Sequence, residues 1–341
     1  MVRVWILLAA LTAALGLAAC GDDDPSADAT AAAPAAAGSF PVTIAHAFGS
    51  TTIDAGPPRV VTWGWGSADA AIALGTTPVA IPFQSYGGDA TGVLPWIREA
   101  LETDGQEIPT VLPDSAEEPP YEEIAAAGPD LILAPYSGVT KKQYELLSAI
   151  APTVAYPDEA WSTPWRDTIA IVGKALGKDA EADALLADID ERFAAEAAEH
   201  SELAGKSVAM VWDAAGTFYV YKKADPRVEA TLSLGLTSAP SVDELCNGDE
   251  TFYYTLSYEQ LDKLTSDILV SFADDEKLSK QFLASPQGRT LPQVKDGRVA
   301  EVVGKDFIAS VSPPTALSLT WGLDEYVEIL AKAAATADAA E

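Results

Sequence analysis

Short runs of mostly apolar residues recur along the chain, separated by stretches with helical spacing. The runs lie at residues 59–62, 131–134, 207–212 and 268–271, and a helix-like stretch at 67–74 ends at Gly75. Strands whose apolar character is continuous rather than alternating are buried on both faces, as in parallel sheets covered by helices. The pattern therefore predicts an α/β fold with parallel-rich sheets.

The two halves of the chain resemble each other. Residues 121–134 align without a gap with residues 258–271, and three of the fourteen pairs are identical. Each stretch predicts a helical turn, then a turn containing Asp, then a four-residue apolar strand. We therefore expect two similar α/β lobes, at residues 39–162 and 205–335, followed by a tail at 336–341.

Helical spacing dominates the segment between the lobes, residues 163–204. Thr163 is positioned to cap a helix that begins at the next residue, a proline, and Gly177 ends that helix. Asp179 is positioned to cap a second helix, which runs to about His200 and would be roughly 30 Å long at ~1.5 Å per residue. A helix of this length predicts a long helical connector between two domains.

The N-terminal segment has the pattern of a processing signal. Arg3 is followed by an apolar run that is short for a membrane span and leads into small residues. The run ends in a sequence that resembles a bacterial lipobox, Leu17-Ala18-Ala19-Cys20. We expect a signal peptide at 1–19, a lipid on Cys20 and a flexible tether at 20–38, which contains no large apolar residue. The folded body would then be extracytoplasmic and anchored to the outer face of the cell membrane through this lipid alone.

Composition and charge exclude several kinds of function. The formal net charge of −30 argues against binding to nucleic acid or to anionic headgroups. Cys20, Cys246, His46 and His200 are the only cysteines and histidines, too few for a disulfide framework or a zinc site. We interpret Cys246 as a structural cysteine. The chain has no Gly-x-Ser-x-Gly elbow, P-loop or dinucleotide fingerprint, so we expect no enzyme, and a secreted hydrolase is the weakest alternative.

Aromatic residues follow the predicted strands or lie in predicted loops. Ligands of open parallel sheets bind beyond the carboxyl ends of the strands, so these rings predict an aromatic-lined cleft. The candidate ligand-binding residues are Trp63, Trp65, Tyr86, Tyr136, Trp161, Trp212, Phe252, Phe272 and Phe307. For Trp212 and Phe272, packing in the core of their own lobe is an equally good interpretation, and for Trp161 packing between the lobes is favoured.

From about residue 41 to residue 330 the chain resembles the iron–siderophore solute-binding proteins of ABC importers, in the group with a helical interdomain connector. The resemblance rests on phrases that occur in order at residues 59–61 with 73–75, 124–126 with 129–132, 146–154, 173–178, 291–299 and 317–324. It implies two Rossmann-like lobes that hold a ferric siderophore between them, a permease as partner, and no cofactor. We expect a monomer.

The resemblance also bears on the charged residues. Relatives dock on the permease through acidic residues at the lobe tips, for which Glu99 and Glu229 are candidates, although a solvated surface charge is the better interpretation in a chain with 51 acids. Relatives that bind anionic chelates grip them with arginines. Only Arg98 and Arg166 lie near predicted cleft loops, so we expect a neutral or cationic hydroxamate chelate.

A rival interpretation is a site for bare ferric ion or another metal chelate, such as haem or cobalamin. Tyr253 and Tyr254 are adjacent, and two tyrosinates with a carboxylate and a histidine such as His46 can ligate Fe³⁺. The same run also predicts a β-strand rich in aromatic and β-branched residues, which we prefer.

Overall fold

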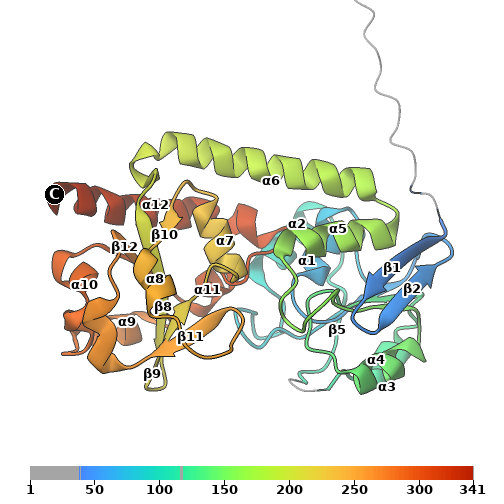
Figure 1. Cartoon of the computed structure of the whole chain (residues 1–341). Coiled ribbons are helices and arrows are strands. Elements are labelled where there is room, and N and C mark those ends of the chain that lie inside the picture. Colours follow the sequence, from blue (N-terminus) through green and yellow to red (C-terminus); the bar gives the residue numbers. More distant parts are fainter. Residues whose placement is uncertain (1–37, 39, 116–117, 341) are drawn as a thin grey trace, which may run out of the picture. The chain divides into compact units, whose positions relative to one another are not determined.

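The computed structural model describes residues 38, 40–115 and 118–340. The predicted signal peptide, the lipidation site Cys20 and nearly all of the predicted tether lie outside them. The described chain is α/β, with two sheet-containing lobes and a long helix that runs alongside both (Figure 1). None of its helices is both long and apolar enough to cross a bilayer.

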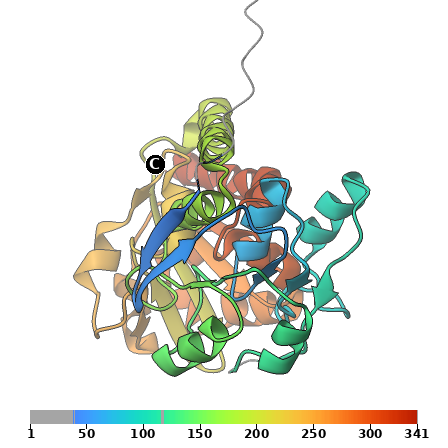
Figure 2. The same cartoon turned by 90° about the vertical axis from the view of Figure 1, so that its right-hand side faces the viewer.

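The N-terminal lobe (N-lobe) is built on a five-stranded parallel sheet in the order β5-β4-β3-β6-β7. Its strands are β3 (Val60–Thr62), β4 (Ala80–Ile81), β5 (Thr110–Val111), β6 (Leu131–Leu133) and β7 (Thr153–Val154). Its helices are α1 (Ser67–Ala73), α2 (Pro95–Thr103), α3 (Tyr121–Ala126) and α4 (Lys141–Ser148). A hairpin of β1 (Val42–His46) and β2 (Gly49–Ile53) is tied to β7 by the Thr51 hydroxyl, which donates to the Thr153 carbonyl at 2.6 Å (Figure 2).

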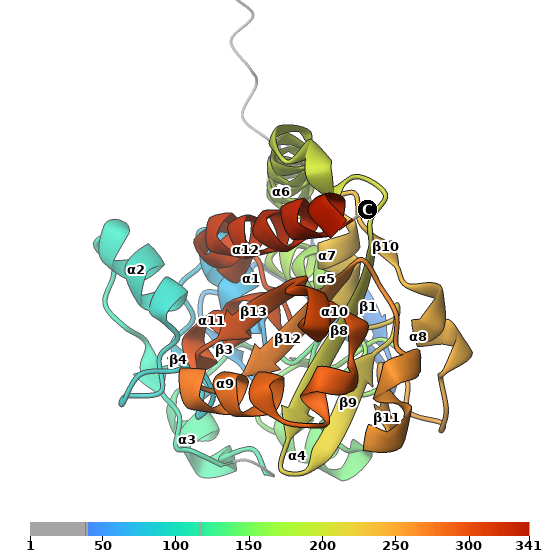
Figure 3. The ribbon, with the colours of Figure 1, turned by 90° about the vertical axis from the view of Figure 1, so that its left-hand side faces the viewer.

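The C-terminal lobe (C-lobe) contains a mixed sheet. The strands β8 (Ser207–Ala214), β10 (Thr237–Ser238), β12 (Ile268–Ala273) and β13 (Val299–Val303) pair in parallel, whereas β9 (Thr217–Tyr221) and β11 (Tyr253–Leu256) extend it antiparallel beside β8. Its helices are α7 (Pro226–Leu232), α8 (Pro240–Glu244), α9 (Glu276–Ala284), α10 (Pro292–Asp296), α11 (Lys305–Val311) and α12 (Ser318–Ala340) (Figure 3). The sheet is therefore parallel-rich, as predicted, with an antiparallel edge.

Both sheets are covered on two faces. In β12, Ile268 and Val270 belong to the hydrophobic cluster that includes α12, while Leu269 between them belongs to a cluster with Phe282 of α9. In β6, Leu131 and Ile132 divide in the same way between two clusters. Strands buried on both faces have no polar side to expose, which explains their continuous apolar sequence.

The predicted repeat occupies equivalent places in the two sheets. β6 lies between β3 and β7, and β12 lies between β8 and β13. The segment before β6 is the helix α3, whereas the segment before β12 is a 3₁₀ helix, Tyr258–Lys263. The repeat therefore extends to topology, with a tighter helix in the second copy.

The connector consists of α5 (Trp165–Leu176) and α6 (Asp179–Glu199), and Gly177 lies between them in the left-handed conformation at φ 67°. Gly177 ends the first helix as predicted. The predicted cap at Thr163 is wrong: its hydroxyl donates to the Pro135 carbonyl at 2.6 Å, and residue 164 is the N-cap.

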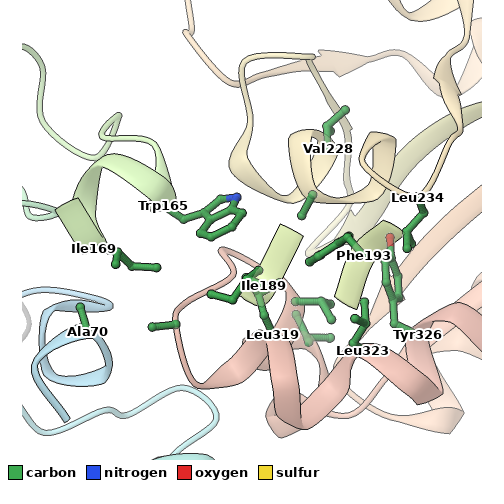
Figure 4. Packing of buried hydrophobic residues seen from close by; sticks show 14 of the residues in the cluster. Ala70, Trp165, Ile169, Ile189, Phe193, Val228, Leu234, Leu319, Leu323 and Tyr326 are labelled. Atoms are coloured by element: carbon green, nitrogen blue, oxygen red, sulfur yellow. The ribbon is translucent and has the colours of Figure 1, made fainter. Parts of the chain in front are cut away.

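One hydrophobic cluster runs through the connector and both lobes. Figure 4 shows Ala70 and Trp165 near one end and Phe193, Leu323 and Tyr326 near the other. The lobes are therefore joined by apolar packing as well as by the chain. The predicted tail from residue 336 is wrong, because α12 continues to Ala340 and buries Ala337.

Candidate functional site

Two cavities lie at the carboxyl ends of the parallel strands, one on each lobe. The C-lobe cavity has a volume of about 460 Å³ and is lined by Tyr86, Trp212, Ala214, Tyr219, Tyr221, Arg227, Phe252, Tyr253, Ile308 and Ser312. The N-lobe cavity has a volume of about 360 Å³ and is lined by Trp63, Gly64, Trp65, Pro82, Phe83, Gln84, Ser85, Asp114, Ser115, Pro119, Gly138, Val139, Gln143 and Trp161. Ser85 lines the N-lobe cavity and the next residue, Tyr86, lines the C-lobe cavity. The two cavities therefore lie on either side of one loop.

Tyr86 carries this loop across to the C-lobe. Its hydroxyl donates to Asp274 at 2.8 Å, and its ring lies 6.2 Å from that of Trp212. Burial, with the Asp274 carboxylate, raises the pKa of Tyr86 well above its usual range. The following Gly87 has φ 78°, and a Cβ there would lie 2.4 Å from Ala309 of α11, so the loop requires glycine to approach the C-lobe this closely.

Arg227 is the only charged residue that lines the C-lobe cavity within the described chain, and the sequence reasoning missed it. It lies in the first turn of α7, with its guanidinium 3.9 Å from the Tyr221 ring centroid. Its Nε donates to the buried Asp225 at 2.7 Å, and its Nη1 has no hydrogen-bond partner among the described residues. Burial raises the pKa of Asp225 while the arginine's charge opposes that rise. The cavity wall therefore contains a buried cation whose charge is balanced by Asp225.

Successive side chains of β9 point to opposite faces of the sheet, so this strand adds two aromatic rings to the C-lobe cavity. Tyr219 and Tyr221 line the cavity, whereas Phe218 and Val220 enter the core behind it. Period-two aromatic residues in a strand are a sequence signal that could have identified these two positions. Arg227 has no such signal: the preceding Asp225-Pro226 marks a helix start, but not what the helix faces.

Three tryptophans line the N-lobe cavity. Trp63 and Trp65 follow β3, and Trp65 Nε1 donates to the Pro313 carbonyl at 2.9 Å. Trp161 is 47% exposed rather than packed between the lobes, and its ring meets that of Tyr136 edge-on at 5.7 Å. Tyr136 lies beside the cavity in a small void that Trp65 also lines, and burial raises its pKa to about 12.

Three of the predicted rings line neither cavity: Tyr136, described above, and two phenylalanines. Phe272 is 2% exposed and lies behind Trp212, 6.0 Å from its ring, and Phe307 is 7% exposed within α11 rather than in a loop. Both belong to the cluster that crosses the connector. Their burial means that they support the cavity wall from the core, so we withdraw them as ligand contacts.

The predicted arginines are engaged elsewhere. Arg98 binds Asp89 and the Thr91 hydroxyl beside α2. Arg166 donates to Asp190 at 2.5 Å and to Glu229 at 2.9 Å. Neither arginine lines a cavity described above, because in this acidic chain each lies within reach of carboxylates on nearby surface segments. Glu229 thus joins α7 to the connector, while Glu99 is exposed on α2.

The arrangement needed to bind bare ferric ion does not form. Tyr253 lines the C-lobe cavity, but Tyr254 is 1% exposed in the core on the other side of β11. His46 lies in the β1–β2 hairpin, 3.0 Å from the Thr51 hydroxyl and 3.3 Å from that of Tyr144. Over the described residues no three His, Cys, Asp or Glu side chains come together as metal ligands. Cys246 is an exposed free thiol.

Comparison with known proteins agrees with this architecture. The family model described as periplasmic binding protein matches residues 60–303. The chain belongs to the periplasmic binding protein family. This binding protein has 34% sequence identity to Streptococcus pneumoniae PiaA, whose structure was solved in complex with ferrichrome, over 86% of this chain and 99% of that one, with a TM-score of 0.78. A periplasmic solute binding protein from Mycobacterium smegmatis is 29% identical over 86% of this chain and 98% of that one, with a TM-score of 0.73.

A curated relative matches a shorter stretch. The Fe(3+) dicitrate-binding periplasmic protein FecB of Escherichia coli is 31% identical over 160 residues, which is 46% of this chain and 49% of that protein. The match thus covers about half the length of FecB, and it covers 38% of the length of a second relative, the achromobactin-binding periplasmic protein of Dickeya dadantii.

Proposed function

We propose that this binding protein captures a ferric siderophore of the hydroxamate class outside the cytoplasm and delivers it to an ABC import permease. The observation that carries the proposal is the C-lobe cavity, where aromatic rings surround one guanidinium whose charge is already balanced. The similarity to PiaA, solved with ferrichrome, supports the same ligand class.

Charge disfavours an anionic chelate. The Arg227 guanidinium is paired with Asp225, and the predicted Arg98 and Arg166 are bound to carboxylates away from the cavities. A ferric trishydroxamate has no net charge at its metal centre, so it brings no unpaired charge to a cavity whose one lining cation is already balanced by Asp225. An anionic catecholate or citrate chelate would leave uncompensated negative charge in the cleft of a chain at −30, which costs free energy.

The test is a titration of the purified folded body, followed by quenching of tryptophan fluorescence. We expect ferrichrome to bind more tightly than a ferric tris-catecholate or ferric dicitrate. Trp212→Ala should weaken ferrichrome binding by about tenfold or more, because a ring in a desolvated site is removed. Trp321→Ala, at a 37% exposed position that lines neither cavity, is the matched control and should bind as the unaltered protein does. Tighter binding of either anionic chelate overturns the proposal.

We also propose how the protein is placed in the cell. Cys20 carries the lipid, so the body is anchored to the outer face of the cell membrane, and the protein is a monomer that meets the permease through surface acids such as Glu99. Cys20→Ser should release the protein into the medium and abolish its labelling by a radioactive fatty acid. A variant that remains in the membrane fraction contradicts the anchor.

A further inference from the structure

The N-lobe cavity differs from the C-lobe cavity in its charge. Asp114 is the only ionisable residue that lines it within the described chain, and no ion pair is found for its carboxylate among those residues. Lys141 and Lys142 begin the nearby helix α4, but both are exposed and neither lines the cavity. This end of the site therefore carries uncompensated negative charge.

Aromatic side chains make up much of the lining of the same cavity. Trp63, Trp65, Phe83 and Trp161 contribute large rings to one space of about 360 Å³. A cation held over aromatic faces is attracted by the negative charge density of the rings, most strongly for tryptophan. Three tryptophans and the exposed Asp114 carboxylate therefore line one space, and each is a group that attracts an alkylammonium ion.

Trp161 shows that this arrangement is held in place. Its backbone has φ 58°, which is rare for a bulky residue, and its side chain is 47% exposed. A Cβ at Gly138 would lie 2.2 Å from Trp161 Nε1, so the ring lies directly on the glycine backbone, with Tyr136 edge-on to it at 5.7 Å. A strained, exposed tryptophan supported by its neighbours indicates a binding role, since core packing does not account for it.

We propose that the N-lobe cavity binds a positively charged ammonium group on the ligand, so that the protein prefers ferric hydroxamates that carry a pendant amine. The inference rests on the proposed function, because the chelate itself would occupy the adjoining C-lobe cavity beyond Tyr86. Asp114 supplies the charge, and the tryptophans supply the aromatic faces.

A pair of chelates that differ only in this charge tests the inference. Ferrioxamine B ends in a free ammonium group, and acetylation of that nitrogen gives a neutral chelate with the same hydroxamate core. We expect the unaltered protein to bind the amine form about tenfold more tightly in low salt, and the preference to shrink as salt screens the carboxylate.

Two variants assign the preference to this cavity. Asp114→Asn should reduce it to about threefold or less, and Trp161→Leu should reduce it similarly, because each removes part of the attraction for the cation. Affinity for the acetylated chelate should change little in Asp114→Asn. Asp54→Asn, an exposed carboxylate that lines neither cavity, is the control and should keep the full preference.

The outcomes separate this inference from the proposed function. Equal binding of the two chelates by the unaltered protein, or an undiminished preference in Asp114→Asn, overturns the ammonium site while leaving hydroxamate capture intact. If the protein binds none of the three chelates (ferrioxamine B, its acetylated form and ferrichrome), both the ammonium site and the proposed function are refuted.

Discussion

Replacing Arg227 by leucine would remove the only charged side chain that lines the C-lobe cavity among the described residues. It would also show how much the buried ion pair contributes to stability. Asp225 is 1% exposed, and its Oδ1 accepts hydrogen bonds from Arg227 Nε at 2.7 Å and from the Arg227 backbone N–H at 2.9 Å. The variant keeps the backbone bond but leaves the carboxylate without a counter-charge.

The cost follows from that burial. Removing one partner of a buried ion pair destabilises a protein by about 3–5 kcal/mol, because the remaining charge is desolvated and unpaired. For a chain of this size the midpoint of thermal unfolding should fall by about 10 °C. Asp225→Asn combined with Arg227→Leu should regain most of this loss, since the neutral amide keeps the oxygen that caps α7.

The pH dependence of stability provides a second test of the same reasoning. Burial raises the pKa of Asp225, and without Arg227 nothing of comparable strength opposes it. The folded single variant then holds a proton at pH values where the unfolded chain has lost it, so its stability should fall as the pH rises through the raised pKa. The deficit relative to the unaltered protein should be larger at about pH 8 than at about pH 5, and the double variant should lack this dependence.

The free energy of unfolding of the unaltered protein, the single variant and the double variant can be measured at both pH values by urea unfolding, monitored by circular dichroism. The double variant, once shown to be folded, also isolates the binding role of the guanidinium: we expect its affinity for ferrichrome to fall by about tenfold. A single variant within about 1 kcal/mol of the unaltered protein at the higher pH would refute the reasoning, as would a double variant no more stable than the single one.

Three further predictions concern other residues. Burial raises the pKa of Asp69 above 3.8, so the stability of the unaltered protein should fall as the pH rises from that value, and Asp69→Asn should flatten this dependence in urea unfolding at a series of pH values. Gly138→Ala should weaken chelate binding in a fluorescence titration by displacing Trp161, whereas Gly56→Ala, where the new Cβ meets only ordinary contacts, should not. Tyr254→Phe removes a buried hydroxyl for which no partner is found among the described residues; it should raise the unfolding midpoint or leave it unchanged, without loss of iron-chelate binding.

Local patterns in the sequence determined the elements and their order. The continuous apolar runs became β3, β6, β8 and β12, and Gly177 separates the two connector helices. These features are local because a strand covered on both faces is built mostly from apolar residues, and a helix ends where a glycine adopts the left-handed conformation. The family was indicated by a resemblance in specific sequence phrases taken in order, and the family model matches residues 60–303.

Which aromatic side chains face the cleft was only partly predictable. Trp63, Trp65, Tyr86, Trp161, Trp212 and Phe252 line the cavities, whereas Tyr136, Phe272 and Phe307 do not. A ring at the end of a strand can turn toward solvent or toward its own core. The choice depends on helices such as α11 and α12, whose contacts with that strand are distant in the sequence.

Which charged residues lie at the cavity, and which are paired elsewhere, was decided by tertiary structure alone. Arg227 matters because Asp225 and Tyr221 contact it at the cavity, and nothing in the sequence indicated this. Arg98 and Arg166, the two candidates from the sequence, instead pair with carboxylates away from the cavities. Pattern determines which segments become helices and strands, since that depends on residues a few positions apart. Whether a charge is buried, paired or free depends on which distant segments meet it, and only the folded chain brings those segments together.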